Sequence, residues 1–310
     1  MRALALHLGL LALLLAGHFL LPAYHHGNLA RIMVLASYAL AYNLLFGYTG
    51  LLSLGHALFF AAGMYGMGLG VQHLGLGAGA GLLLGIASGA VVSGVVAALA
   101  LRSAGVAFMI VTLMFAQAGF LAILHFGDWT RGDEGFVLAQ TGRTLLGHDL
   151  SAPGPRYLAA LALFSACLLL SLALVRSPFG RVLVAIRENE ERVRMLGYDT
   201  QAHRFAAMLA SGTMAATAGA VYGMLFGYVG ATFASVQYSI LPLLWVLLGG
   251  AGTVLGPFIG TLFMFYLIDL SSGITTAYML FAGVALVALT LFAPQGLMGE
   301  VRRRVWRGLP

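Results

Sequence analysis

Long apolar runs alternate along the chain with short polar or glycine-rich interruptions, and this pattern predicts a series of membrane-spanning helices. A helix needs roughly 20 apolar residues to cross the hydrocarbon core of a bilayer. Runs of about that length, some a little shorter, cover residues 3–21, 30–47, 51–70, 78–101, 105–124, 157–175, 205–229, 238–250, 254–270 and 275–293. We therefore predict an all-α, polytopic transmembrane helical bundle of about ten spans, forming a single transmembrane domain over residues 1–310.

Two places leave the number of spans open. The runs 238–250 and 254–270 are short and are separated by glycines and Pro257, so they form either two full spans or one re-entrant pair. The first run, 3–21, is longer than the apolar region of a usual signal peptide and lacks a clear small-residue cleavage site after it. We expect it to be retained as a span, with a cleaved signal peptide as the alternative.

Composition supports the membrane assignment and charge sets the orientation. The chain is 61% hydrophobic and 8% charged, whereas soluble domains carry about 25% charged residues. Six arginines lie between residues 176 and 204 and four more in the last nine residues, while the polar stretch 125–156 is richer in acids. The positive-inside rule places the arginine-rich segments in the cytoplasm. We expect 125–156 outside, both termini in the cytoplasm, and no nucleic-acid binding, because no basic stripe is interleaved with exposed aromatics.

A short motif occurs twice and indicates an internal repeat. Gly47-Tyr48-Thr49-Gly50 and Gly227-Tyr228-Val229-Gly230 are offset by 180 residues, and each follows one apolar run and precedes another that glycines interrupt. The apolar runs that precede the two copies are the second and the seventh in the series. Because they are five spans apart, an odd number, the two copies lie on opposite faces of the membrane. Paired broken helices of this kind are typical of inverted repeats and of translocation paths. We expect a 5+5 inverted repeat with halves 28–124 and 205–299.

The first copy of the motif leads into a segment with several polar side chains. Non-helical backbone at membrane depth is tolerated where protein or a water-filled cavity satisfies it. One interpretation is that such polar groups line a translocation path; the alternative is that they bond neighbouring helices. The candidate path residues are Tyr48, Thr49, Ser53, His56, Gln117 and Ser235. No metal site, no cofactor and no catalytic residue is expected, since no second histidine or acid lies at metal spacing from His56.

The predicted spans contain few groups that can couple transport to an ion gradient. Ion-coupled carriers keep buried ionisable groups because such groups are costly in lipid and persist for a function. Asp269, at the outer end of the run 254–270, is the only acid within a predicted span. A polar residue at the membrane interface is a simpler interpretation of Asp269 than an ion-coupling group.

The arginine-rich segment 176–204 predicts an amphipathic helix in the cytoplasm. Ser177 and Pro178 have the residue preferences of a helix start, and Gly197 those of a helix end. Apolar residues follow helical spacing on one face. The other face offers three oppositely charged pairs at i,i+4: Arg187 with Glu191, Glu188 with Arg192, and Glu190 with Arg194. The helix either docks on a protein partner or lies on the membrane surface.

Four stretches of the sequence resemble one known family. SPFGRVLVAIRENEERVRMLGYDT (Ser177 to Thr200), YNLLFGYTGLLSLGHALFFAAGMYG (Tyr42 to Gly66), LLGGAGTVLGPFIG (Leu247 to Gly260) and APQGLMG (Ala293 to Gly299) are similar to the LivM-type permease subunits of branched-chain amino acid ABC importers. The resemblance covers the chain from about residue 30 onward. It implies a multi-pass permease of a bacterial cytoplasmic (inner) membrane that moves a small polar solute, in the first place leucine, isoleucine or valine.

The resemblance also implies partners and a coupling helix. Such permeases pair with a second, LivH-type permease, two ATP-binding subunits and an extracytoplasmic solute-binding protein, and ATP hydrolysis lies on the separate subunits. The residues that would dock on an ATP-binding subunit are Gly180, Ala185, Ile186, Arg187, Glu188, Asn189, Glu190 and Gly197. No phosphate-binding G-x-x-x-x-G-K-[ST] loop occurs in this chain, as expected for a permease.

Other functions remain as alternatives. A permease of the same class for urea or short amides would have the same architecture, because the separate binding protein largely sets the affinity. An autonomous ion-coupled secondary transporter requires a charged site in the bundle. An intramembrane enzyme is least favoured, since the sequence contains neither H-E-x-x-H nor G-x-S-x-G.

Overall fold

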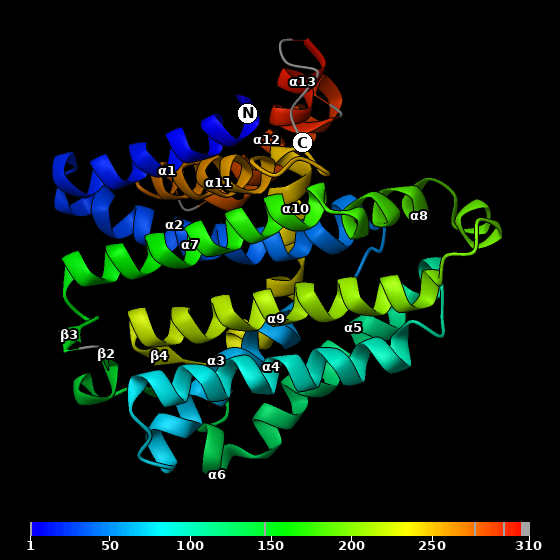
Figure 1. Cartoon of the computed structure of the whole chain (residues 1–310). Helices are drawn as coiled ribbons and strands as arrows, with labels where there is room; N and C mark the ends of the chain where they lie inside the picture. The colour runs from blue at the N-terminus through cyan, green and yellow to red at the C-terminus, as the bar shows by residue number, and fades with distance from the viewer. Residues whose placement is uncertain (1, 146, 276, 294, 305–310) are drawn as a thin grey trace.

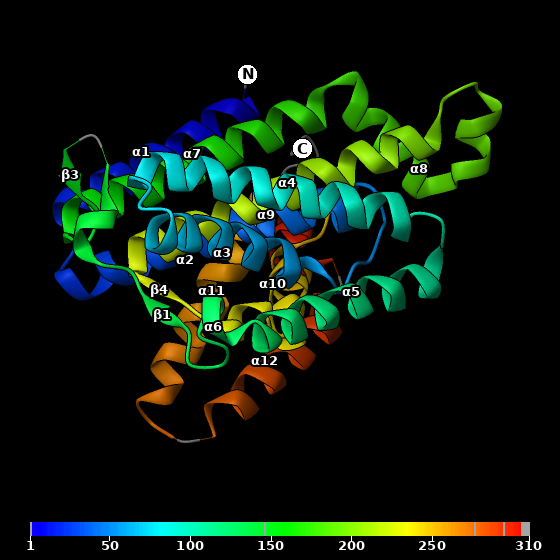
Figure 2. The same ribbon diagram turned by 90° about the horizontal axis from the view of Figure 1, so that it is seen from below.

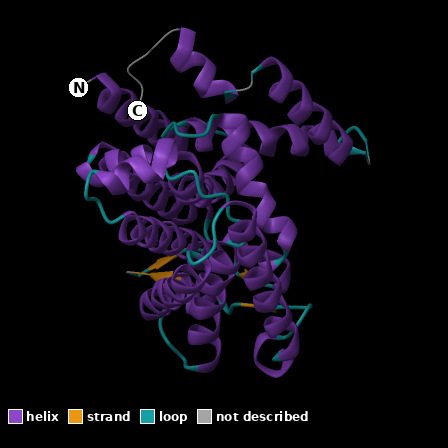
Figure 3. Cartoon of the chain, turned by 90° about the vertical axis from the view of Figure 1, so that its right-hand side faces the viewer, coloured by secondary structure: helices purple, strands orange, loops and turns teal. Residues whose placement is uncertain are grey.

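The computed structural model describes residues 2–145, 147–275, 277–293 and 295–304, and this part of the chain is almost entirely helical (Figure 3). Most of the long helices run side by side along one direction (Figure 1). The helices are α1 (Arg2–Leu20), α2 (Ala23–Asn43), α3 (His56–His73), α4 (Ala78–Ala100), α5 (Gly105–His125), α6 (Gly127–Thr130), α7 (Pro153–Arg176), α8 (Pro178–Met195), α9 (Thr200–Phe226), α10 (Val236–Gly249), α11 (Gly256–Ser272), α12 (Tyr278–Phe292) and α13 (Gly296–Arg304). The all-α helical bundle is confirmed.

Short elements lie between these helices. They are the π-helix η1 (Leu44–Tyr48), the 3-10 helices η2 (Gln140–Arg143) and η3 (Ala231–Ala234), and the two-residue strands β1 (Phe136–Val137), β2 (Thr144–Leu145), β3 (His148–Asp149) and β4 (Tyr228–Val229). Strands β1 and β4 pair antiparallel, as do β2 and β3. The β2–β3 pair and α8 lie at opposite ends of the bundle (Figure 1). This arrangement agrees with the expectation that segments 125–156 and 176–204 lie on opposite sides of the membrane.

Helix α2 lies at the centre of the bundle. Its residues from Ile32 to Asn43 are all buried, and it packs against α7, α9, α10 and α11. A second layer is formed by α3, α4 and α9 (Figure 2). Here small residues allow very close approach: a Cβ atom on Gly219 of α9 would lie 1.9 Å from the carbonyl oxygen of Phe60 on α3. Close packing on α9 also explains the glycines of α4: a Cβ atom on Gly89 would lie 1.9 Å from the side chain of Ala216 on α9.

Ten equal spans are not what the structure contains. Within its described part, the helices long and apolar enough to cross a membrane, by length and composition, are α2 with η1, α4, α5, α7 and α9. Helix α10 has 14 residues, and at 1.5 Å per residue it is about 21 Å long, shorter than the roughly 30 Å of a bilayer core. Helices α10 and α11, in the runs 238–250 and 254–270, have 14 and 17 residues and are therefore shorter than those five helices.

The predicted continuous run 51–70 is wrong at its start. Backbone from Gly50 to Gly55 is irregular, and α3 begins at His56. Gly50 adopts φ +76°, a conformation that ends a helix. Side chains satisfy the freed backbone groups: the Leu54 N–H donates to Thr112 Oγ1 at 3.1 Å and the Gly55 N–H to Ser53 Oγ at 3.1 Å. The apolar run hides this break because its residues are as hydrophobic as those of a span.

The amphipathic helix predicted in the arginine-rich segment is α8. Ser177 caps it, accepting a hydrogen bond from the Gly180 N–H at 3.2 Å, and Gly197 follows it with φ +87°. One difference is a break at Asn189, whose φ of −161° and ψ of 99° divide α8 into two parts. Arg307 of the basic tail lies outside the described residues.

Candidate functional site

The candidate site begins where two broken segments meet inside the bundle. The first turns of α3 and α10 lie against each other: the Ala57 N–H donates to Ser239 Oγ at 3.0 Å. From this point the helices run in opposite directions. Helix α3 ends beside α6, where His73 Nε2 and the Trp129 carbonyl are 3.1 Å apart. Helix α10 instead ends at Gly249, beside the segment that follows α2. Two helix N-termini, with their partly positive ends, therefore share one buried place.

His56 occupies the start of α3 and is fully buried. Its Nε2 lies 2.9 Å from Ser211 Oγ on α9, and the Ser211 hydroxyl donates to the Ala41 carbonyl of α2 at 2.5 Å. Because the single hydroxyl proton of Ser211 is used in that bond, His56 Nε2 carries the proton and donates to Ser211. The Tyr42 and Phe59 rings pack on the imidazole with centroids 4.6 and 5.4 Å away. His56 Nδ1 is buried without a hydrogen-bond partner among the described residues, so a charged ring would leave a buried N–H unpaired. The neutral ring thus links α3, α9 and α2.

The other polar residues of the first broken segment bond to nearby backbone. Thr49 Oγ1 donates to the Leu44 carbonyl at 3.0 Å, and the Ser53 carbonyl accepts a bond from the Tyr42 hydroxyl at 3.0 Å. Tyr48, Thr49 and Ser53 are all buried. The structure brings these three residues and His56 into one continuous, packed segment. The Thr49 and Ser53 hydroxyls bond the interrupted backbone, whereas the Tyr48 hydroxyl is buried without a hydrogen-bond partner among the described residues.

Ser235 and Gln117 approach the same region from other elements. Ser235 caps α10, its Oγ accepting a bond from the Tyr238 N–H at 3.3 Å. Gln117 lies half-buried on α5, a helix that packs against α3, η3 and α10. Ser53, His56, Gln117 and Ser235 therefore come from elements around the meeting point of α3 and α10, whereas Tyr48 lines a pocket with Arg187 and Arg302 at the end of the bundle that carries α8.

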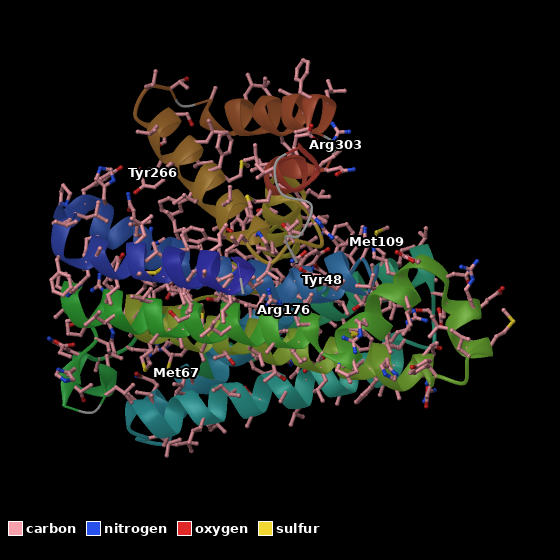
Figure 4. All side chains as sticks on the ribbon, turned by 45° about the horizontal axis from the view of Figure 1, so that its top comes forward. Tyr48, Met67, Met109, Arg176, Tyr266 and Arg303 are labelled. Carbon is pink, nitrogen blue, oxygen red and sulfur yellow. The ribbon has the colours of Figure 1, made fainter. Side chains whose placement is uncertain are left out.

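A second junction lies at the end of the bundle that carries α8. Figure 4 labels Tyr48 near Arg176, the last residue of α7, and Tyr266 toward the other end of the bundle. Asn43, the last residue of α2, is buried here and bonds the loop between α10 and α11 twice. Its Oδ1 accepts from the Gly252 N–H at 3.0 Å and its Nδ2 donates to the Thr253 carbonyl at 2.9 Å. The sequence analysis did not select Asn43, because a single asparagine in an apolar run carries no signal of its partner.

Two arginines hold the backbone of this junction from the outside. The Arg187 guanidinium of α8 donates to the Gly47 carbonyl, and Arg302 Nη1 of α13 donates to the Gly252 carbonyl at 3.3 Å. Gly47 and Gly252 are in direct contact, since a Cβ on Gly47 would lie 2.6 Å from the Gly252 nitrogen. Helix α8 is therefore connected through one side chain to the break that follows α2.

The second Gly-Tyr motif has a comparable arginine at the opposite end. Arg143 in the segment 125–156 is buried, and its Nε donates to the Met224 carbonyl at 2.7 Å while its Nη2 donates to the Leu225 carbonyl. These are orphan carbonyls at the C-terminus of α9, which ends at Gly227 in the left-handed conformation with φ +74°. An arginine from another segment thus bonds backbone carbonyls at each copy: the carbonyl of Gly47 within the first copy, and those of Met224 and Leu225 just before the second.

The residues named for docking divide between two faces of α8. Gly180 and Ile186 are buried against the rest of the chain, whereas Arg187, Glu188 and Asn189 are exposed. Ala185 is half-buried, and Gly197 is exposed beyond the helix end. Asn189 Oδ1 accepts from the Arg192 N–H at 2.9 Å and so starts the second part of α8.

Glu190 is engaged inside the loop itself. It pairs with Arg204 at 3.0 Å and with Arg194 at 3.1 Å, and Thr200 Oγ1 also donates to it. Of the three predicted i,i+4 pairs, the described ion pairs contain the one between Glu190 and Arg194. The buried partner Arg204, ten residues beyond the pair, was not predicted.

An aromatic cluster beside the broken segments was not selected from the sequence. The Tyr38 ring stacks on Tyr238 with centroids 5.9 Å apart, and Phe60 packs on both at 4.8 and 5.2 Å. Phe233 of η3 joins the cluster at 5.1 Å from Tyr238. The Tyr38 hydroxyl donates to the Tyr238 carbonyl at 3.2 Å. These rings fill the space between α2, α3 and α10, and no spacing in the sequence indicates their meeting.

Asp269, the acid considered for ion coupling, lies near the start of α2. The Tyr24 hydroxyl donates to its Oδ2, and Asn28 Nδ2 lies 3.4 Å from the same oxygen. Tyr24 is exposed. Among the described residues, no group of three or more histidines, cysteines or acids is arranged to hold a metal ion.

Comparison with known proteins gives consistent matches. A family model described as the permease component of branched-chain amino acid transport systems matches residues 26–292. The high-affinity branched-chain amino acid transport system permease protein LivM of Escherichia coli K12 is 28% identical over 306 residues, covering 87% of this chain and 69% of that protein. A probable LivM of Methanocaldococcus jannaschii is 34% identical over 143 residues, 41% of each chain.

A third relative belongs to another import system. The autoinducer 2 import system permease protein LsrC of Photorhabdus laumondii is 30% identical over 131 residues, 38% of each chain. No solved structure matches the chain.

Proposed function

The chain belongs to the permease-component family of branched-chain amino acid transport systems, and we propose that it forms one half of the membrane path of an ATP-driven importer for leucine, isoleucine and valine. The observation that carries the driven mechanism is the bond from Arg187 of α8 to the Gly47 carbonyl. It joins an amphipathic helix outside the bundle to the interrupted segment inside it. Movement of α8 is therefore transmitted to the break after α2.

The arrangement of the broken segments supports an inverted 5+5 repeat. Helix α3 begins at His56 and α10 at Val236, the same offset of 180 residues that separates the two Gly-Tyr motifs. The two helices start together and run in opposite directions. In this proposal the two halves are α1–α5 and α7 with α9–α12, five helices each, whose cores are residues 28–124 and 205–299. The solute passes near the place where α3 and α10 begin. Tyr48, Thr49, Ser53, His56, Gln117 and Ser235 line or gate that passage, as broken helices do in other transporters.

The solute is small and has both polar and apolar parts. Neutral His56, hydroxyl groups and two helix N-termini supply hydrogen bonds, and the cluster of Tyr38, Phe60 and Tyr238 supplies an apolar surface. This combination fits an amino acid with an aliphatic side chain better than it fits urea, which has no apolar part to bury.

Energy and solute are supplied by other subunits. In the proposal, α8 and both termini face the cytoplasm of a bacterial cell, and segment 125–156 faces outward toward a solute-binding protein. The exposed residues Glu188 and Asn189 contact an ATP-binding subunit directly, while Arg187 connects α8 to the Gly47 carbonyl. Gly180 and Ile186 are buried, so they position α8 on the bundle. A second permease subunit and a second ATP-binding subunit complete the complex.

Two measurements test this function. The complex in proteoliposomes should take up labelled leucine when ATP is enclosed and binding protein is outside, with isoleucine and valine competing and urea not. Uptake by the isolated chain driven by a proton or sodium gradient would contradict the proposal, and competition by urea alone would change the substrate.

Docking through α8 is tested by charge reversal at one exposed residue. Glu188→Arg should abolish copurification of the ATP-binding subunit, because it reverses a charge on the exposed face of α8. Glu190 is unsuitable, since its reversal breaks the pair with buried Arg204. Glu134→Arg, an exposed residue in segment 125–156, is the matched control and should keep the ATP-binding subunit bound.

A further inference from the structure

A cavity of about 650 Å³ lies between α8, the α10–α11 loop and α13. Its wall contains the arginines Arg187, Arg302 and Arg303, the polar residues Thr253 and Gln295, and the apolar residue Leu247. Figure 4 labels Arg303 on α13, in the same half of the bundle as Tyr48. The cavity is distinct from the meeting point of α3 and α10, and none of the candidate path residues lines it.

The wall of this cavity is strongly cationic. Its described lining residues include three arginines and no carboxylate. In the bonds that the structure describes, Arg187 donates to the Gly47 carbonyl, Arg302 to the Gly252 carbonyl, and Arg303 to Glu300 Oε1 at 2.6 Å. A guanidinium carries five N–H donors in a planar fork, so donors remain on each of the three for an anion. Phosphate oxygens match that fork in two-point contacts.

An apolar surface accompanies the cationic cavity. Helix α12, which precedes α13, lies at the edge of the bundle (Figure 2), and along it Val284, Val287, Leu291 and Phe292 are 59–83% exposed. A groove of about 540 Å³ runs over these residues. Leu247 in the cavity wall is also 44% exposed. A small hydrophilic anion has no use for such a surface, whereas the chains of a lipid cover it.

We propose that this cavity binds the phosphate group of an anionic glycerophospholipid from the leaflet on the α8 side, with an acyl chain lying along α12. Basic pockets between membrane helices on the cytoplasmic side are suited to such headgroups, because lipid and protein charges meet there at a low dielectric. Arg187 and Arg302 also hold the backbone of Gly47 and Gly252. A bound lipid phosphate therefore stabilises the arrangement of the junction after α2.

The proposal is tested on the full-length chain in its purified complex by native mass spectrometry after incubation with phosphatidylglycerol or phosphatidylcholine. Phosphatidylglycerol should remain bound and phosphatidylcholine should not. Arg303→Gln, at a side chain that is 59% exposed, should lower phosphatidylglycerol retention about fivefold, since one arginine near a membrane surface contributes about 1 kcal/mol. Arg302→Gln with Arg303→Gln should lower it further. Arg102→Gln, which removes an exposed arginine of the α4–α5 loop, is the matched control and should change nothing.

Three outcomes of this lipid-binding measurement would overturn the proposal. Equal retention in Arg303→Gln and Arg102→Gln would show that binding depends on net charge and not on the cavity. Displacement of the lipid by millimolar inorganic phosphate would identify a site for free anions. Retention by the isolated chain but not by the complex would show that an acidic surface of another subunit occupies the cavity. The measurement needs no transport, so it stands or falls independently of the proposed function.

Discussion

The side-chain amide of Asn43 bonds to Gly252, whose N–H donates to Asn43 Oδ1 at 3.0 Å across 209 residues of sequence. The same amide donates to the neighbouring Thr253 carbonyl at 2.9 Å. Asn43 ends α2 and Gly252 lies in the loop between α10 and α11. One buried side chain therefore joins the first proposed half of the chain, 28–124, to the second, 205–299.

Replacing Asn43 by leucine should destabilise the protein strongly. The change keeps a similar volume but leaves the Gly252 N–H and the Thr253 carbonyl without their partner, and each buried unsatisfied group costs about 1–3 kcal/mol. Thermal unfolding in detergent measures the loss. Ser37→Ala is the control, because Ser37 is equally buried on α2 but bonds the Met33 carbonyl of its own helix. Equal unfolding temperatures for the two variants would contradict this role of Asn43.

Arg187→Lys should separate ATP hydrolysis from transport. Lysine keeps the positive charge but lacks the planar fork that reaches the Gly47 carbonyl from α8. A hydrogen bond to a charged group contributes about 1.5–3 kcal/mol, so we expect solute moved per ATP hydrolysed to fall about tenfold or more. Uptake and hydrolysis are measured together in proteoliposomes. Arg192→Lys, on the exposed side of α8, should leave the ratio unchanged; an unchanged ratio in Arg187→Lys would exclude the proposed connection.

Gly219→Ala should weaken the packing of α9 on α3. The added Cβ would lie 1.9 Å from the Phe60 carbonyl oxygen, so the two backbones must move apart. Overpacking of this kind costs about 1–3 kcal/mol. Gly283→Ala on α12 adds the same methyl group where nothing lies within 4 Å. It should unfold at the same temperature as the parent chain or slightly higher, because alanine favours a helix over glycine. If the thermal unfolding temperature falls in Gly219→Ala but not in Gly283→Ala, the close contact between α9 and α3 causes the loss of stability, and helix propensity does not.

The hairpin around Asp149 should persist in moderately acidic solution. Hydrogen bonds from Ser151 and Gln140 lower the pKa of the Asp149 carboxyl to about 2. Because the folded pKa is below the usual value, the contribution to stability is complete above about pH 4 and is lost as the pH falls through about 2. Hydrogen exchange at the Ser151 amide, which donates to Asp149 Oδ1 at 2.8 Å, follows this opening.

Asp149→Asn tests the same hairpin at neutral pH. The asparagine amide group faces the donors of Ser151 and Gln140, which bond Asp149 Oδ2 at 2.7 and 2.6 Å. Exchange at Ser151 should therefore be faster in Asp149→Asn. Asp133→Asn, at an exposed acid of the same outer segment, should leave it unchanged. If both variants exchange alike, the carboxylate does not hold the hairpin.

The amino-acid sequence determined the features that depend on neighbours along the chain. The lengths of the apolar runs predicted most helices within a few residues, and the pair Ser177 and Gly197 predicted the limits of α8 through local capping. The repeated Gly-Tyr motif located the interruptions after α2 and α9. These predictions held because hydrophobic periodicity, capping and backbone conformation act over one or two helical turns.

Only the tertiary structure decided which polar groups meet. His56 with Ser211, Asn43 with Gly252 and Arg187 with Gly47 each join residues that lie 140 or more positions apart. The late start of α3, at His56 and not at residue 51, also escaped prediction, because the irregular backbone before it is satisfied in part by Thr112 of α5. Inside a bundle every polar group must find a partner, but an apolar pattern does not say where that partner lies. The helices follow from local chemistry, and the site follows from how they pack.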